Sequence, residues 1–227
     1  MFSSTPLRIR FSTANAYLIP AQTGYVLIDS GDPGFTFRLF QMLARHAIAP
    51  THITLIILTH THFDHIGGLW AIQAQSNAPV LVHTAEADDL AAGRVVIPPG
   101  TLKTTRLLSW LGQRLSRFFH FPGYQAELVI SEEISLAAFG LAGRILHTPG
   151  HSPGSISIIL DNGDAFVGDI CPNTWYNRWR GSHFPPFAYD VVAVYSSWRK
   201  LVDSPAQTLY PGHGAPYPAG VLRRELG

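Results

Sequence analysis

The sequence contains a single cysteine, Cys171, among 227 residues. One cysteine excludes an internal disulfide and a zinc site built from several thiolates. Charged residues are also scarce, at 14%, and the formal net charge is only +1. This scarcity argues against long disordered segments and against a general nucleic-acid-binding surface. Since 46% of the residues are hydrophobic, the chain can instead bury one sizeable core.

Long apolar runs are absent as well. No segment approaches the roughly 20 apolar residues that a membrane-spanning helix needs. Residues 1–10 lack the long apolar stretch of a secretory signal peptide. We therefore expect a cytoplasmic protein whose residues 1–227 form one domain, without a nucleic-acid partner. The sequence leaves its oligomeric state open.

Histidine, in contrast, is abundant, and part of it is concentrated in one place. Residues 60–65 read His-Thr-His-Phe-Asp-His, which puts four metal-ligand side chains within six positions. The apolar run 53–58 directly before them predicts a buried strand, so the cluster begins where a strand ends. Imidazole and carboxylate groups suit zinc, and also iron or manganese. A polar loop that is merely rich in histidine would not be expected to lack Lys and Arg, so we predict a metal site.

The apolar pattern predicts strands and helices twice over. In the first half, strands are expected at 16–19, 25–28, 53–58 and 80–82, with helices over 37–46 and 85–92. In the second half, strands are expected near 127–130, 134–138, 144–147, 155–160, 165–167 and 208–210, with a helix over 189–202. This order predicts two α/β halves packed sheet against sheet, with residues 93–125 as a helical insert between them.

Three later strand ends resemble the first one. His151, Asp169 and His213 each follow an apolar strand, and each is bracketed by glycine or proline. Taken alone, each is more often structural, because Asp after Gly is common in turns and single histidines are often buried for packing. Their repetition at strand ends favours side chains that converge on one cleft.

In their order along the chain, these side chains resemble the motifs of the metallo-β-lactamase superfamily. The matching ligand positions are His60, His62, Asp64, His65, His151, Asp169 and His213. Asp29, in Asp29-Ser30-Gly31, resembles the first motif of the superfamily. The resemblance covers about residues 15–215 and implies an α/β fold of the four-layer αββα type, with the metal site at one edge between the sheets. It specifies the fold and the metal site but not the substrate.

The resemblance implies two metal ions per chain, zinc by expectation, with iron or manganese as alternatives. His60, His62 and His151 would hold the first ion. Asp64, His65 and His213 would hold the second, and Asp169 would bridge the two. Seven side chains exceed what one tetrahedral zinc accepts, which supports two ions independently. Asp64 and Asp169 are the expected catalytic residues, and Asp29 is expected to orient a ligand histidine from behind.

Several branches of the superfamily are disfavoured by single positions. True β-lactamases usually lack the carboxylate at Asp169, and flavodiiron proteins commonly carry Glu where this chain has His62. Lactonases often have Tyr where Pro172 stands. Neither the basic helical region by which glyoxalase II binds glutathione nor the basic arm of ribonuclease Z is evident in the sequence.

The resemblance thus implies a metal-dependent hydrolase that cleaves an ester, thioester or lactone bond, with a metal-bridging hydroxide as the nucleophile and a small, hydrophobic molecule as the favoured substrate. Three alternatives stay open. One is a ribonuclease Z-like phosphodiesterase. Another is a persulfide dioxygenase, which shares much of the motif set but uses one iron. The third is a metal-binding fold that acts mainly through a partner.

The insert and a later aromatic segment are the candidate substrate-binding regions. An amphipathic helix is expected over 102–119, and it carries Trp110. Three interpretations of this helix stay open: its apolar face packs on the domain, it forms a lid over the metal cleft, or it lies on a membrane surface. The aromatic segment, 172–187, is expected to be a loop that brings Tyr176 and His183 to the pocket.

Overall fold

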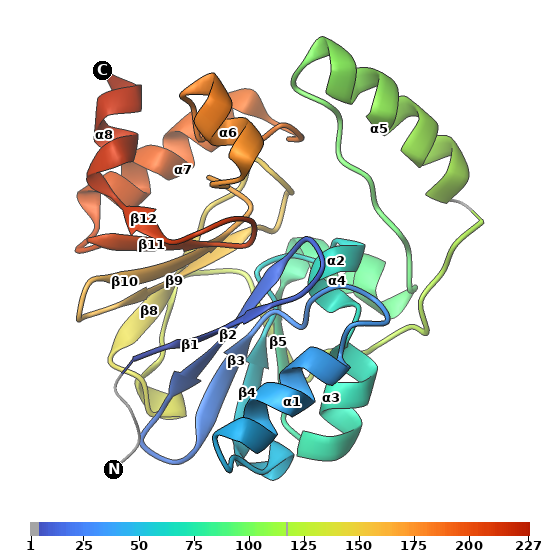
Figure 1. Ribbon diagram of the computed structural model, residues 1–227, viewed down its shortest axis with the longest axis vertical. Helices are drawn as coiled ribbons and strands as arrows, with labels where there is room; N and C mark the ends of the chain where they lie inside the picture. The colour runs from blue at the N-terminus through green and yellow to red at the C-terminus, as the bar shows by residue number, and fades with distance from the viewer. Residues whose placement is uncertain (1–4, 117) are drawn as a thin grey trace.

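The structure, a computed structural model, describes residues 5–116 and 118–227. Two six-stranded sheets pack face to face, and helices cover the outer side of each (Figure 1). The first sheet has the order β1 (Leu7–Arg10), β2 (Asn15–Pro20), β3 (Tyr25–Ile28), β4 (Ile53–Ile57), β5 (Val80–His83) and β6 (Leu128–Ile130). The second has the order β12 (Tyr217–Pro218), β11 (Thr208–Pro211), β10 (Asp164–Gly168), β9 (Ile156–Leu160), β8 (Gly143–His147) and β7 (Ile134–Ser135). The predicted αββα sandwich is confirmed.

Helices flank both sheets. The helices of the first half are α1 (Phe37–Arg45), α2 (Phe63–Ile66), α3 (Leu69–Ser76) and α4 (Thr84–Ala91). Those of the second half are α6 (Trp175–Arg180), α7 (Val191–Asp203) and α8 (Gly220–Leu226). Helix α5 (Lys103–Ser116) lies between the halves in sequence and at the periphery of the molecule in space (Figure 1). No helix within the described residues is long and apolar enough to cross a membrane.

The central strands β3 and β4 are almost entirely apolar because both faces of the sheet are covered there. Leu18, Leu27 and Ile56 pack towards the helices of the first half. Ile57 and Phe166, from opposite sheets, belong to the cluster that fills the space between the sheets. Strands β3, β4, β5 and β6 are parallel, so their carboxyl ends share one edge. Parallel pairing of β10 with β11 gives the second sheet an equivalent edge.

Two local predictions are wrong. Residues 175–180 were expected within a loop, yet they form α6. Thr174 and Asn177 cap its start reciprocally, the Thr174 hydroxyl accepting from the Asn177 backbone N–H, so a short polar signal outweighs the surrounding prolines. The apolar side of the insert helix was one expected packing face, but the buried residues of α5 are Thr105 and Ser109.

Candidate metal centre

The ligand-type side chains all stand directly after strands. The loop after β4 carries His60 and His62, and α2 follows it with Asp64 and His65. In the second half, the loop after β8 carries His151. Asp169 and His213 follow β10 and β11, which pair side by side in parallel. The two sheet edges therefore deliver the seven predicted ligands to one place.

Distances between the donor atoms show how closely they converge. His62 Nδ1 lies 2.9 Å from His151 Nε2, and the ring centroids of His60 and His151 are 4.8 Å apart. His213 Nε2 lies 3.2 Å from Asp64 Oδ2 and 3.1 Å from Asp169 Oδ2.

The donors also fall into overlapping groups of three, each with its ligand atoms within 4.8 Å of one another. These groups are His60–His62–His151, His60–His65–Asp169 and Asp64–His65–His213. The Asp169 carboxylate lies between two of these groups. Its Oδ2 is 3.7 Å from His151 Nε2 and 3.1 Å from His213 Nε2.

Several of the candidate metal-ligand atoms have no hydrogen-bond partner among the described residues. They include Nε2 of His60, Nε2 of His65 and Oδ1 of Asp169, all buried. Buried polar atoms are nearly always satisfied in folded proteins, so such a concentration calls for an explanation. Lone pairs from imidazoles and a carboxylate match the ligand preferences of zinc and iron. The residues present therefore fit metal ions, and their number suits two.

The local electrostatics keep most of the candidate ligands in the protonation state that binds metals. Burial, and then the neighbouring His65, lower the pKa of His60 well below its usual value. Burial together with His151 lowers the pKa of His62 to about 3. Burial would raise the pKa of Asp169, but the nearby His213 and His65 hold it well below its usual value. A neutral imidazole and an ionised carboxylate are the forms that bind metals.

Asp29 contacts His65 on the side away from the cluster. Its carboxylate accepts hydrogen bonds from the Thr59 backbone N–H at 2.8 Å and from His65 Nδ1 at 2.8 Å. The backbone at Asp29 has a φ of 58°, a left-handed conformation that Asp and Asn tolerate better than most residues. Because Nδ1 of His65 is occupied, its Nε2 faces the centre. From this geometry we propose that Asp29 orients His65.

We predict that Asp29→Asn weakens metal binding by about 10–100-fold, the range seen when a partner of a ligand histidine is lost. Asparagine keeps the shape and the left-handed backbone but removes the charge that holds His65. Metal affinity is measured by titration of the metal-free protein. Asp161→Asn, at an exposed site between β9 and β10, is the matched control. Equal affinity in both variants would contradict the role given to Asp29.

Two further groups that support the centre could not be identified from the sequence. Buried Glu86 accepts from the Thr61 backbone N–H at 3.1 Å and from the Gly154 backbone N–H at 2.9 Å, so it joins the two loops that carry histidines. The Thr13 carbonyl accepts from His213 Nδ1 at 2.8 Å. Nothing in the neighbouring sequence indicates that a glutamate on an amphipathic helix or a threonine in a turn makes such contacts.

A cavity of about 390 Å³ opens beside the centre. One wall consists of metal-ligand candidates, namely His62, Asp64, His151, Asp169 and His213. The facing walls are mostly apolar, formed by Phe63, Val96, Ile97, Pro98, Pro172, Pro185, Pro186 and Phe187. None of the described residues that line it is Lys or Arg. The Phe187 carbonyl accepts from His151 Nδ1 at 2.9 Å, so one segment both walls the cavity and positions a ligand.

The three predicted pocket residues are not among those that line this cavity. The Nδ1 of His183 contacts Glu225 Oε1 at 2.6 Å, and its ring stacks on Tyr217. Tyr176 packs beside Trp179 on α6. Trp110 is half exposed on α5 beneath the Arg114 guanidinium. The walls come instead from residues 96–98 and 185–187, and the Ala188 backbone N–H donates to the Pro99 carbonyl at 2.9 Å to hold the two segments together.

The chain belongs to the metallo-beta-lactamase superfamily, whose family profile matches residues 9–213. It is 32% identical to the probable metallo-hydrolase MJ0888 of Methanocaldococcus jannaschii, over 89% of this chain and 88% of that protein. It is 29% identical to the probable metallo-hydrolase YflN of Bacillus subtilis, over 94% and 85% of the two chains.

Solved structures agree on the fold. The crystal structure of BLEG-1 B3 metallo-beta-lactamase superposes with a TM-score of 0.72 at 24% identity, covering 96% of this chain and 95% of the other. That of TTHA1623 in a di-iron-bound form gives a TM-score of 0.69 at 25% identity, over 97% of each chain. The predicted superfamily is therefore confirmed.

Proposed function

We propose that this protein is a single-domain hydrolase that uses two zinc ions to cleave an ester, thioester or lactone bond in a small, uncharged, hydrophobic molecule. The observation that carries this proposal is the convergence of two groups of three donors, with Asp169 beside histidines of both groups, at one wall of an apolar cavity. The names of two relatives, both described as probable metallo-hydrolases, support the same reaction class. Its expected location is the cytoplasm.

The metal-holding roles follow from the grouping of the donors. His60, His62 and His151 would hold one ion, and Asp64, His65 and His213 the other. Asp169 would be shared, because its two oxygens face histidines of both groups. The chemistry supplied by two such ions is polarisation of a carbonyl oxygen and an activated water at neutral pH.

The chain's own residues would position the reactants. Asp64 lines the cavity, and contact with His213 lowers the pKa of this carboxyl to about 2 although burial opposes that change. Its carboxylate is therefore ionised and would accept a hydrogen bond from the attacking water, orienting that water towards the substrate. The wall of prolines around Phe187 would exclude bulk water and contact the apolar part of the substrate.

The lining favours a carbonyl substrate over a phosphodiester. Proteins that recognise phosphate commonly use Arg or Lys, and the described lining residues include neither. The lining therefore also disfavours a nucleic-acid substrate. An uncharged acyl group, in contrast, matches the walls formed by Val96, Ile97 and Phe187.

The test combines metal analysis with a substrate panel. Protein purified without added metal is expected to contain about two zinc ions per chain, by the grouping of the donors into two sites. Zinc-loaded protein is then assayed with matched esters, thioesters, lactones and phosphodiesters, each with a short and a long acyl or alkyl chain. The long-chain carboxylic substrates are expected to react fastest. One iron per chain with oxygen-dependent sulfur oxidation, or a preference for phosphodiesters, would overturn the proposal.

A further inference from the structure

Helix α5 turns its small polar residues towards the protein and its leucines away from it. Thr105 and Ser109 are buried, and the Ser109 hydroxyl donates to the Pro98 carbonyl at 2.7 Å. Leu107 and Leu111 are 67% and 48% exposed. Leu108 and Leu115 are exposed beside them. At about 100° per residue, the four leucines form one stripe on the side of the helix opposite Ser109.

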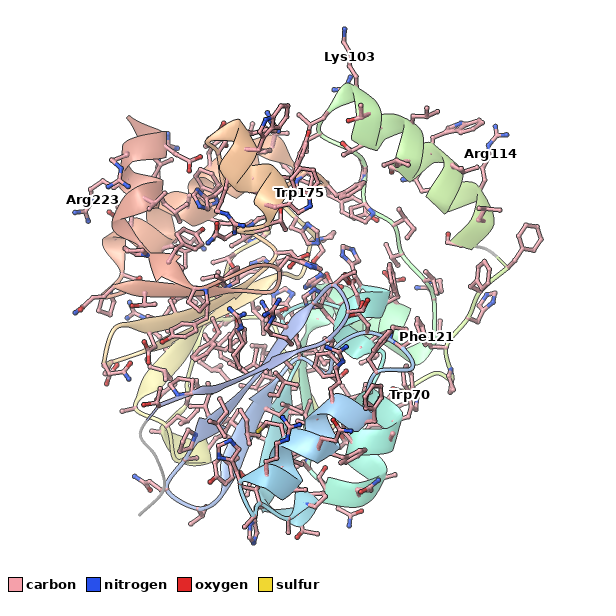
Figure 2. All side chains as sticks on the ribbon, viewed as in Figure 1. Trp70, Lys103, Arg114, Phe121, Trp175 and Arg223 are labelled. Atoms are coloured by element: carbon pink, nitrogen blue, oxygen red, sulfur yellow. The ribbon has the colours of Figure 1, made fainter. Side chains whose placement is uncertain are left out.

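A basic and aromatic border runs along one side of this stripe. Lys103, Arg106 and Arg114 are exposed there, and Arg114 lies 4.0 Å from the centroid of the Trp110 ring. Lys103 and Arg114 point outward from the molecule (Figure 2). Residues 93–122 contain no Asp or Glu, so no carboxylate within the segment balances these charges. A leucine stripe bordered by Trp, Lys and Arg is the composition of helices that lie at a membrane surface.

More exposed aromatic rings surround the stripe. Phe118 and Phe119 follow α5, and both are exposed. Trp175 and Trp179 on α6 are 73% and 76% exposed. Helices α5 and α6 occupy the same end of the molecule (Figure 1). Apolar and aromatic exposure is thus concentrated at the end that also carries the basic residues of α5.

The base of the insert is fixed to the rest of the protein. Phe121 stacks on Trp70 with ring centroids 5.5 Å apart, and its backbone N–H donates to the Gly93 carbonyl at 2.9 Å. On the other side, the Thr101 backbone N–H donates to the Pro186 carbonyl at 2.9 Å. Because both connections to α5 are anchored, the helix holds its leucine stripe in a defined direction.

We propose that α5 docks on a membrane surface that contains anionic phospholipids. The leucines would enter the boundary between headgroups and acyl chains, and Lys103, Arg106 and Arg114 would contact the phosphates. A second copy of the chain is the competing occupant of an exposed leucine stripe. The basic border favours the lipid, because anionic headgroups supply the negative charge that α5 itself lacks.

Docking in this way has a consequence for the substrate, which rests on the proposed hydrolase function. Residues 96–98 wall the cavity and lead directly into α5, so a docked helix would hold the cavity close to the bilayer. The substrate class that fits both features is an amphiphilic ester or thioester that partitions into the membrane.

The test is co-sedimentation of the metal-loaded protein with vesicles of phosphatidylcholine mixed with phosphatidylglycerol, and with vesicles of phosphatidylcholine alone. The protein is expected to sediment with the mixed vesicles and to be released by added salt. The combined change Leu107→Gln, Leu111→Gln and Leu115→Gln is expected to abolish binding. Neutralising Lys103, Arg106 and Arg114 with glutamine is expected to weaken binding on the order of a hundredfold, at about fivefold for each charge.

Phe37→Gln is the matched control, since Phe37 is as exposed as Trp110 but stands on α1, which lies well apart from α5 (Figure 1). It is expected to bind the mixed vesicles like the unaltered protein. All the changed side chains are exposed, so unchanged thermal unfolding will verify that the variants fold. The metal-centre variant Asp169→Asn is expected to bind vesicles normally while it loses hydrolysis. Vesicle binding by a protein that hydrolyses no member of the panel would therefore refute the proposed function and leave the docking proposal standing.

Two results would overturn the docking proposal. One is an unaltered protein that stays in the supernatant with both kinds of vesicle. The other is a dimer, seen by sedimentation velocity, that the leucine variant converts to a monomer without any vesicle binding. That second result would assign the leucine stripe to a second copy of the chain.

Discussion

Asp169→Asn is expected to remove most of the bound metal and to lower kcat/KM by more than about a hundredfold. Loss of a residue that merely orients a ligand already costs 10–100-fold, and Asp169 faces histidines of both donor groups directly. Asparagine has nearly the same shape, so the packing around it is retained while the shared negative charge is removed. Metal content by mass spectrometry and hydrolysis of the preferred panel substrate measure the two effects.

The control for this change is Asp164→Asn, which neutralises a carboxylate at the start of the same strand, β10, far from its metal-facing end. That variant is expected to keep its metal and its activity. If Asp169→Asn retained two metal ions per chain and full activity, the shared role assigned to Asp169 would be wrong.

Gly212→Ala is expected to weaken metal binding through a single methyl group. A Cβ at this position would lie 2.3 Å from Asp169 Oδ1 and 2.6 Å from His65 Cε1. Both neighbours are held in place, His65 by Asp29 and Asp169 by His213. The chain at Gly212 is itself fixed by a hydrogen bond to the Gly168 carbonyl at 2.7 Å. The methyl group would therefore displace two metal-ligand candidates, and we expect at least about a tenfold loss of metal affinity.

Gly220→Ala provides the comparison, because an added Cβ there meets no atom within 4 Å. Gly220 begins α8, where alanine is the better helix former, so this variant is expected to be as stable as the unaltered protein or slightly more so. Metal titration and thermal unfolding of both variants separate displacement of the ligands from a general loss of stability. Unchanged metal affinity in Gly212→Ala would refute the steric argument.

The convergence of the candidate ligands could be predicted from the sequence because its signals are local. Each candidate ligand follows a short apolar run, and Gly or Pro flanks His151, Asp169 and His213. Parallel strands then bring such ends to one edge without any further information, as β10 and β11 do for Asp169 and His213. The buried strand expected at 53–58 was likewise found at Ile53–Ile57.

The surroundings of the centre could not be predicted, because they depend on contacts between distant segments. The cavity walls at 96–98 and 185–187 meet only through tertiary hydrogen bonds. His183 contacts Glu225, which lies 42 residues further along the chain, and nothing near either residue marks that pairing. For α5, the amphipathic pattern identified the helix but not which side faces the protein. Small polar residues pack there because they let the helix approach the Pro98 carbonyl.

Glu86 has a consequence for folding as well as for the site. It links the loop of Thr61, in the first half, to the loop of Gly154, in the second, and each candidate metal group also draws on both halves. Metal ions bound at this edge would add cross-links between two halves that apolar contacts and hydrogen bonds already join. By mass action, a higher concentration of free metal would then raise the free energy of unfolding. A chelator would weaken the contact between the two sheets before it affected either sheet itself.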